Sequence, residues 1–235
     1  MQTKTEIVPV DGSDMPIYVA TPDAPGRYPG VVVMCHITGV DTFTQDVCKR
    51  LAGAGYVAAS PDVFHYHEWI EDRPERFATL RDTRIVDDTN ATLAYFEKAG
   101  NVAMDRVAII GHCMGGRTSL LGAGAIPRFA ALMMAYGGRT MISWGTGLPT
   151  PFELIRNVTC PVIGLYGGLD QQPSPEDVDK IEAEMRRHVI AAEFHRYPSA
   201  GHAFQDHTAA NRYNEEASED AWAKTLAFLD KTLRH

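Results

Sequence analysis

A six-residue turn, Gly111-His112-Cys113-Met114-Gly115-Gly116, constrains the fold more than any other segment of this sequence. The apolar run at 106–110 precedes it and is typical of a strand buried on both faces, as in a parallel sheet. The stretch at 117–125 follows it and predicts a buried helix, because it is rich in small and apolar residues. Glycines lack a Cβ and let the backbone pack closely around a sharp turn. We therefore expect a strand, a tight turn and a helix, with Cys113 at the apex.

Apolar strand-like runs alternate with helical patterns along the rest of the chain. Strands are predicted at 30–35, 55–62, 129–136, 161–166 and 193–197, and helices at 44–53, 84–98, 175–188 and 217–233. This alternation indicates an α/β fold with a mostly parallel central sheet and helices on both faces. The segment 65–84 is crowded with aromatic and charged residues, and we expect a helical excursion that shapes a binding site there. No repeat or long linker divides the chain, so residues 1–235 are expected to form a single domain.

Charge and composition exclude several classes of partner. The formal net charge of -8 argues against a nucleic-acid partner, which would need a basic stripe. No run of about 18 apolar residues occurs, and the N-terminal stretch lacks the apolar core of a signal peptide, so neither a membrane span nor a secretory leader is expected. The cysteines form no C-x-x-C pair, which favours reduced thiols in the cytoplasm; they are Cys35, Cys48, Cys113 and Cys160.

Neither a metal nor a cofactor is expected. The run His65-Tyr66-His67-Glu68 places two histidines at alternate positions, but no third ligand follows at a familiar spacing. The Gly137-Gly138 turn lacks the G-x-G-x-x-G spacing of a dinucleotide-binding loop. We therefore look for chemistry that side chains and backbone groups can perform by themselves.

The turn around Cys113 has the form G-x-C-x-G, the cysteine version of the nucleophile-elbow pattern of α/β-hydrolases. In those folds the acid and then the histidine follow the nucleophile along the chain. Asp170 follows a predicted strand through a glycine turn, and His202 lies in a glycine-containing loop after the next strand. Each residue has a simpler interpretation, as a buried cysteine, a turn aspartate and a loop histidine. Their joint occurrence in this order favours a Cys-His-Asp triad at the carboxyl edge of the sheet.

The sequence resembles the dienelactone hydrolase family. The resemblance rests on G-H-C-M-G-G around Cys113, G-G-L-D at Asp170 and G-H-A-F at His202, with VVVMCHITGVD and AGYVAASPDVF earlier in the chain. It implies an α/β-hydrolase fold without a cofactor, in which Cys113 is the nucleophile, Asp170 the acid and His202 the base. The backbone N–H of Met114, just after the nucleophile, is expected to bind the oxyanion, and the resemblance points to Ile37 for the second donor.

These residues predict a hydrolase that cleaves a small carboxylic ester or lactone through a thioester intermediate. A thiolate leaves a tetrahedral adduct more easily than an amine does, so esters and enol lactones are favoured over amides. Four side chains are expected in the substrate pocket, namely His36, His112, Arg76 and Trp144. The sequence marks no dimer face, so a monomer or a small homo-oligomer is expected.

Two departures from the family pattern bear on the substrate. His36 stands where many members carry a glutamate that takes part in controlling the thiol. After the expected catalytic histidine, where the family places a carboxylate-binding arginine, this chain has Asp206, which would repel an anion. Another family arginine is expected in the irregular segment, where the candidates are Arg73, Arg76 and Arg81. We therefore predict that dienelactone is not the preferred substrate.

Two other interpretations of the function remain open. The first is a non-catalytic small-molecule-binding protein that has the fold of the family but no catalytic activity. The replacement of the family glutamate by His36 would be the sign of this loss of activity. A chain with an exposed thiolate at Cys113 would serve as a thiol-based sensor, since such thiolates oxidise readily. Cys35 is the candidate for a partner thiol close in space.

Overall fold

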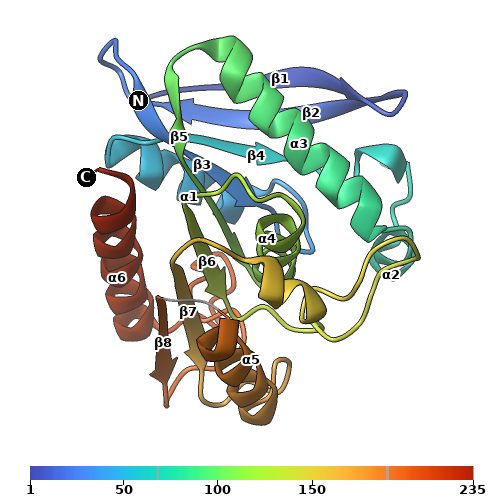
Figure 1. Cartoon of the computed structure of the whole chain (residues 1–235), viewed down its shortest axis with the longest axis vertical. Helices are drawn as coiled ribbons and strands as arrows, with labels where there is room; N and C mark the ends of the chain where they lie inside the picture. The colour runs from blue at the N-terminus through green and yellow to red at the C-terminus, as the bar shows by residue number, and fades with distance from the viewer. Residues whose placement is uncertain (68, 189–190, 235) are drawn as a thin grey trace.

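The computed structural model describes residues 1–67, 69–188 and 191–234, which form one eight-stranded sheet flanked by helices (Figure 1). The strands are β1 (Gln2–Val10), β2 (Ser13–Thr21), β3 (Tyr28–Met34), β4 (Val57–Pro61), β5 (Val102–His112), β6 (Ala131–Ala135), β7 (Val162–Gly167) and β8 (Ala192–Tyr197). The helices are α1 (Thr42–Gly53), α2 (Arg73–Ala78), α3 (Asp82–Ala99), α4 (Met114–Ala125), α5 (Pro175–His188) and α6 (Glu215–Leu233), with 3₁₀ helices η1 (His65–His67) and η2 (Glu153–Asn157).

The sheet has the order β1-β2-β4-β3-β5-β6-β7-β8. β2 runs antiparallel to both of its neighbours, β1 and β4, and every other neighbouring pair is parallel. The predicted fold class, a mostly parallel sheet of the α/β-hydrolase type, is therefore confirmed. Because β3, β5, β6, β7 and β8 are parallel, the loops that follow them leave the sheet at one common edge.

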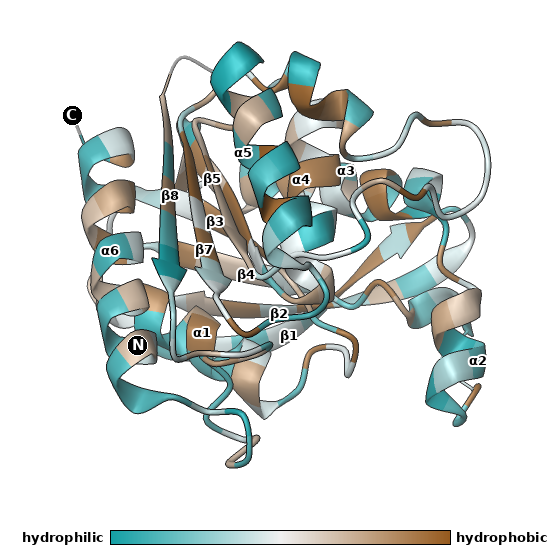
Figure 2. Cartoon of the chain, turned by 90° about the horizontal axis from the view of Figure 1, so that it is seen from below, coloured by the Kyte–Doolittle hydropathy of each residue, from teal (hydrophilic) through white to brown (hydrophobic). Residues whose placement is uncertain are grey.

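Helices cover both faces of the sheet, as the prediction required (Figure 2). α3, α4 and α5 lie on one face, and α1 and α6 on the other. Ile109 and Ile110 are neighbours on β5, yet they belong to the two different cores and both are fully buried. Successive side chains of a strand point to opposite faces, which is why the strand at 106–110 is apolar throughout. Within the described ranges, no helix is long and apolar enough to span a membrane.

The hairpin formed by β1 and β2 lies outside the elements predicted from the sequence. The two strands pair from Gln2 with Thr21 to Val10 with Ser13, and they are joined by Asp11 and Gly12, both at positive φ. An Asp-Gly turn between two strands is a strong hairpin signal, because both central residues of such a turn adopt positive φ. The segment 65–84 contains η1 and α2 and then the start of α3.

The turn between β5 and α4 holds Cys113 in a backbone conformation that is rare for an L residue, with φ 55° and ψ −121°. Gly111 and Gly115 make this turn possible. A Cβ on Gly111 would lie 2.0 Å from the carbonyl oxygen of Gly115, and a Cβ on Gly115 would lie 2.2 Å from that of Met34. Both distances are far below any real carbon–oxygen contact, so only glycine fits at these two positions.

We expect Gly115→Ala to lower the free energy of unfolding by about 3 kcal/mol or more, because its methyl group would displace the backbone of β3. The matched control is Gly53→Ala in α1, where an added Cβ meets no atom of the described chain within 4 Å and helix propensity improves. Urea unfolding followed by circular dichroism measures both variants. Equal unfolding midpoints for the two variants would show that the turn does not depend on this close approach.

Candidate active site

The loops after β5, β7 and β8 bring together the three residues predicted to form the triad. The Nε2 atom of His202 lies 3.0 Å from the Sγ atom of Cys113. The Nδ1 atom of His202 lies 2.8 Å from the Oδ2 atom of Asp170. Cys113 and His202 are 89 positions apart in the sequence, and Asp170 and His202 are 32 positions apart. The three residues nevertheless form a continuous hydrogen-bonded chain at the carboxyl edge of the parallel strands.

Asp170 is held rigidly at the buried end of this chain. Its side chain is almost completely buried, and its Oδ1 atom accepts a hydrogen bond of 2.8 Å from the backbone N–H of Gln172. Both carboxylate oxygens therefore have a partner, which fixes the plane of the carboxylate against the His202 ring. This arrangement orients the imidazole with Nε2 toward the thiol.

The surroundings of His202 favour its protonated, positively charged form. Burial alone would lower the pKa of His202, but hydrogen bonds with Asp170 and Cys113 and the negative charges of both groups raise it to about 10. The ring of Tyr136 packs edge-on against His202, with 5.4 Å between the ring centroids. The site therefore favours the protonated, positively charged form of His202 at neutral pH.

Cys113 differs from the other three cysteines in its surroundings. All four thiols are free, but Cys35, Cys48 and Cys160 are buried, whereas Cys113 is only partly buried. Burial raises the pKa of Cys35 and Cys48 far above the ordinary range and raises the pKa of Cys160 to about 11. Thiolates are the reactive form, so these three thiols are inert by comparison.

The two residues expected to donate to the oxyanion, Met114 and Ile37, both line the cavity that contains Cys113. Met114 is the first residue of α4, so its N–H has no acceptor within the helix. Ile37 lies in the loop that follows β3. The amino end of α4 also carries a partial positive charge that favours an anion at this place.

A cavity of about 640 Å³ opens above Cys113. Its lining is mostly apolar, with arginine and amide side chains at intervals; it consists of Ile37, Arg73, Pro74, Phe77, Cys113, Met114, Arg117, Gly138, Arg139, Trp144, Leu169, Asp170, Gln171, Gln172 and His202. All three members of the predicted triad, both expected oxyanion residues and Trp144 are among them. Three other expected pocket residues, His36, His112 and Arg76, are not.

His36 is hydrogen-bonded near the start of α1 and is not among the residues that line the cavity. Its Nε2 atom lies 2.8 Å from Asp41 Oδ1 and 2.8 Å from Thr38 Oγ1. Burial raises the pKa of Asp41, but the hydrogen bonds with His36 and Thr38 outweigh this effect and lower it to about 2. Asp41 in turn caps α1 by accepting the N–H of Thr44. His36 therefore braces the loop that carries Ile37 and does not line the cavity.

His112 and Arg76 also lie outside the cavity. His112 is buried between the rings of Phe43 and Tyr136, and burial together with the nearby charge of His36 lowers its pKa to about 3. It is therefore a neutral packing residue at the end of β5. The guanidinium of Arg76 stacks over the Phe64 ring at 4.8 Å. The cavity arginine from this segment is instead Arg73, one helical turn earlier.

Asp206 does not face the substrate space, which corrects the expectation that it would repel an anion. Its side chain is buried, and its Oδ1 atom accepts hydrogen bonds from the backbone N–H and the hydroxyl of Thr208. The carboxylate stabilises the loop after His202. Arg117 and Arg139 are two cavity residues that sequence reasoning missed, because the sequence alone does not show which way their side chains point.

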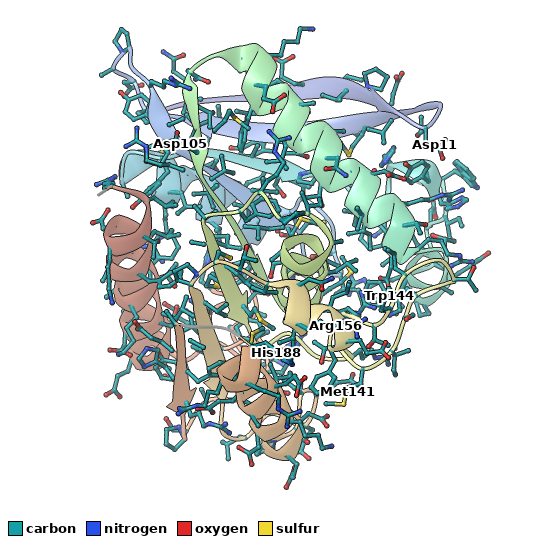
Figure 3. The ribbon with its side chains drawn as sticks, viewed as in Figure 1. Asp11, Asp105, Met141, Trp144, Arg156 and His188 are labelled. Carbon is teal, nitrogen blue, oxygen red and sulfur yellow. The ribbon has the colours of Figure 1, made fainter. Side chains whose placement is uncertain are left out.

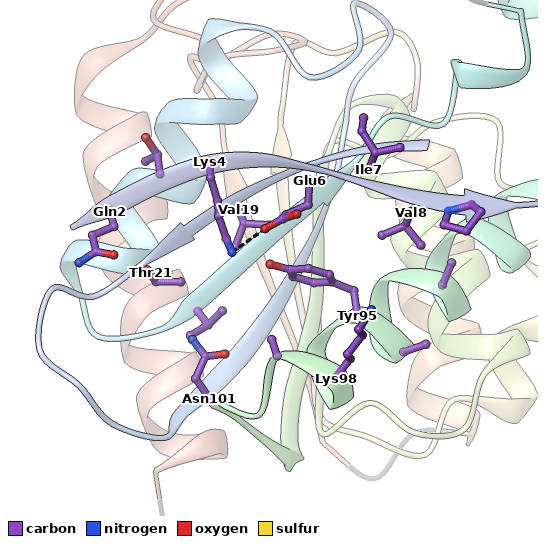
Figure 4. Close-up of a pocket in the computed structure, with 16 residues that line it drawn as sticks. Gln2, Lys4, Glu6, Ile7, Val8, Val19, Thr21, Tyr95, Lys98 and Asn101 are labelled. Carbon is purple, nitrogen blue, oxygen red and sulfur yellow. Dashed lines mark ion pairs between the residues drawn. The ribbon is translucent and has the colours of Figure 1, made fainter. Parts of the chain in front are cut away.

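A second cavity, of about 740 Å³, lies between the β1–β2 hairpin and α3 (Figure 4). It is lined by Lys4 and Glu6, which form an ion pair, and by Tyr95, Lys98 and Asn101. Its described lining contains no cysteine, serine or histidine, so it holds no counterpart of the contact between Cys113 and His202. The smaller cavity above Cys113 is therefore the candidate active site.

Among the residues with a described position, no group of three or more His, Cys, Asp or Glu side chains is arranged to hold a metal ion. Within the run 65–68, His65 pairs through Nε2 with Asp88 at 3.0 Å in the core. Glu68 lies outside the described residues.

A mostly parallel eight-stranded sheet with a cysteine at the strand–helix turn, followed by an acid and a histidine after later strands, defines an α/β-hydrolase. The model of the dienelactone hydrolase family matches residues 15–233. This chain belongs to the dienelactone hydrolase family, and the resemblance seen in its motifs is confirmed.

Relatives and solved structures agree with this assignment. A Salmonella typhimurium protein named "Putative carboxymethylenebutenolidase" is 31% identical over 234 residues, covering 94% of this chain and 84% of the relative. A Bradyrhizobium protein named "Probable 2-oxo-3-(5-oxofuran-2-ylidene)propanoate lactonase" is 31% identical over 226 residues, covering 93% and 90%. The crystal structure of a "Putative Dienelactone Hydrolase" from Klebsiella pneumoniae superimposes with a TM-score of 0.87 at 29% identity, covering 97% of this chain and 98% of the other. The chain is thus a hydrolase of this family.

Proposed function

We propose that this chain cleaves a small carboxylic ester or lactone, with Cys113 as the nucleophile, His202 as the base and Asp170 as the orienting acid. The observation that carries the proposal is the continuous chain of contacts, 3.0 Å from Cys113 to His202 and 2.8 Å from His202 to Asp170. The names of the relatives, a carboxymethylenebutenolidase and a lactonase, support a lactone or ester as the substrate.

Acylation begins with proton transfer from Cys113 to His202, which gives a thiolate–imidazolium pair. The raised pKa of His202, with burial opposing and the contacts to Asp170 and Cys113 prevailing, supports this resting state. The thiolate adds to the carbonyl carbon and forms a carbon–sulfur bond, and the carbonyl oxygen becomes an oxyanion. His202 then gives its proton to the leaving alkoxide or enolate oxygen as the carbon–oxygen bond breaks.

The oxyanion is held by the backbone N–H groups of Ile37 and Met114 in this mechanism. Both residues lie on the cavity wall beside Cys113, and the Met114 N–H is the first of α4. Two such donors stabilise the tetrahedral intermediate, and removing one typically costs about 10²–10³ in rate.

Deacylation repeats the same steps with water in place of the thiol. After the alcohol leaves, His202 is neutral and removes a proton from a water molecule that attacks the thioester. The carbon–sulfur bond breaks, the acid is released and the thiolate–imidazolium pair returns. Asp170 keeps the imidazole in one tautomer through both halves of the cycle.

The substrate is expected to combine an apolar body with an activated ester oxygen. Phe77, Trp144 and Leu169 supply apolar lining near the thiol. Arg73 and Arg139 also line the cavity, so a negative substituent on the substrate is tolerated. The expected low preference for dienelactone therefore rests on His36 alone, which supplies no carboxylate beside the thiol.

The proposal is tested by measuring kcat/KM, under reducing conditions, for a panel of aryl esters, alkyl esters, five- and six-membered lactones and dienelactone. We expect hydrolysis of esters and lactones, with dienelactone below the best substrate. A best rate on dienelactone would contradict the substrate assignment. Hydrolysis of no compound in the panel would favour a binding protein or a thiol sensor over an enzyme.

A further inference from the structure

Arg117 is a fully buried arginine in the wall of the active-site cavity, and the mechanism above makes no use of it. Its guanidinium forms a two-pronged ion pair with Asp82, at 2.7 Å from Nη1 to Oδ1 and 3.0 Å from Nη2 to Oδ2. A buried ion pair contributes little to stability compared with apolar residues of the same volume, because both charges lose their hydration. Its presence in the cavity wall therefore calls for an explanation other than stability.

The same guanidinium holds the loop that follows β6. Its Nε–H donates to the carbonyl oxygen of Arg139 at 3.2 Å, and its Nη2–H donates to that of Ile142 at 2.6 Å. The planar fork of an arginine can serve a carboxylate and two carbonyls at once, which a lysine cannot do. Arg117 thereby fixes two points of this cavity-lining loop.

Trp144, on the same loop, contacts both partners of the ion pair, Arg117 and Asp82. Its ring lies against the Arg117 guanidinium, 3.6 Å from the ring centroid. Its backbone N–H donates to Asp82 Oδ2 at 2.9 Å, and its carbonyl accepts the N–H of Asp82 at 2.8 Å. Figure 3 shows Trp144 beside the start of α3, where Asp82 lies. The Phe77 ring of α2 packs against it at 5.0 Å between centroids.

Arg117 is also tied to the nucleophile turn. It lies one helical turn after Cys113 on α4, and its backbone N–H donates to the carbonyl oxygen of Cys113 at 3.3 Å. One residue thus connects the segment that carries the thiol with another segment that lines the same cavity. A rigid connection of this kind fixes the distance between the attacking atom and the surface against which the substrate lies.

We propose that Arg117, through its ion pair with Asp82, is a positioning residue that holds Trp144 and the 139–144 backbone as a substrate-binding wall of the cavity that contains Cys113. This inference rests on the proposed function of the cavity. It assigns Arg117 to substrate binding: loss of the guanidinium raises KM while the relay from Cys113 to Asp170 continues to set kcat.

The test uses the double variant Arg117→Met/Asp82→Leu, which removes the ion pair without leaving a charge buried alone. We expect a folded enzyme with KM for the best ester of the panel raised about tenfold or more and kcat within about threefold of the wild type. Hydrogen–deuterium exchange should rise at residues 139–148 and stay unchanged in β5 and β7. The matched control is Arg128→Met, which removes an exposed ion pair with Glu97 and should leave KM and exchange unchanged.

A double variant with the KM and the exchange pattern of the wild type would overturn the inference. If the double variant does not fold, Arg117→Lys decides, because it keeps the charge but loses the fork: the proposal requires a raised KM and faster exchange at 139–148. A wild type that hydrolyses no ester would refute the proposed function instead, and the exchange data would still report whether Arg117 holds the loop.

Discussion

Replacing Cys113 with alanine is expected to lower kcat/KM for every ester that the wild type hydrolyses by at least about 10⁴-fold. The variant keeps His202 and Asp170 but has no atom that can form the carbon–sulfur bond. Only general base catalysis of direct water attack and binding near the oxyanion donors would remain. Initial rates of p-nitrophenyl acetate hydrolysis, under reducing conditions, measure the effect.

The matched control for this experiment is Cys160→Ala. Cys160 is a free thiol in the core, remote from the cavity lining, so its loss removes a cysteine without touching the relay. Its kcat/KM should stay within about threefold of the wild type, as for a small volume change outside the site. A Cys113→Ala variant that retains more than about a tenth of the wild-type rate would show that another group performs the attack.

Changing Asp170 to asparagine is expected to lower kcat by about 10²–10⁴-fold with little change in structure. The amide can donate a hydrogen bond to Nδ1 of His202 and so favour the tautomer whose Nε2 carries the proton. In that tautomer Nε2 cannot accept the proton of Cys113. The substitution also removes the negative charge that stabilises the imidazolium.

The pH dependence of this variant identifies the cause of its lower rate. In the wild type, the pKa of His202 is raised to about 10 against the effect of burial, so the imidazolium persists as the pH rises and is lost only near that value. We therefore expect kcat/KM to hold to about pH 9 and to fall above it, as His202 loses the proton that the leaving group needs. Without the Asp170 contact the pKa falls, and this alkaline limb should move to lower pH.

The pH–rate profiles of wild type, Asp170→Asn and Asp46→Asn between about pH 7 and 11 provide this measurement. Asp46 is a half-exposed carboxylate that contacts His207 at 3.1 Å on the surface, so its variant removes a second Asp–His pair outside the site. Its alkaline limb should match the wild type. An unmoved limb in Asp170→Asn would mean that Asp170 does not control the ionisation of His202.

Much of the site was predictable because each residue of the expected triad lies in a short motif that can be recognised in the sequence. The turn at Cys113 needs glycines on both sides for steric reasons. The G-x-C-x-G pattern in the sequence therefore predicts this turn. Asp170 and His202 follow strands of a parallel sheet, and the carboxyl ends of parallel strands meet at one edge. The order of the residues and the topology together predicted a meeting of three distant loops.

The remainder of the cavity depends on side-chain direction, which spacing in the sequence does not determine. His36 is expected in the pocket, but it is hydrogen-bonded to Asp41 and Thr38, and none of these three residues lines the cavity. The sequence predicts Arg117 only as part of a buried helix, and Asp82 only as part of the charged segment 65–84. Arg117 and Asp82 are 35 positions apart in the sequence, so their pairing can be recognised only in the three-dimensional structure.

The sequence contains a turn motif that indicates the β1–β2 hairpin, but the prediction did not use it. Asp11-Gly12 separates two nine-residue segments, and Asp-Gly is a favoured two-residue hairpin turn. β2 then adds to the parallel part of the sheet through β4 in antiparallel orientation. The hairpin lies at the edge of the sheet, remote from Cys113, so this omission did not affect the predicted site.

The most direct test of the account is mass spectrometry of the wild-type enzyme quenched with acid during turnover of p-nitrophenyl acetate. We expect one acetyl group per chain, located by peptide mapping on Cys113, and its disappearance once the ester is exhausted. Continued hydrolysis with Cys113 unmodified, or with the acetyl group on another residue, would contradict the proposal that the thiol is the nucleophile.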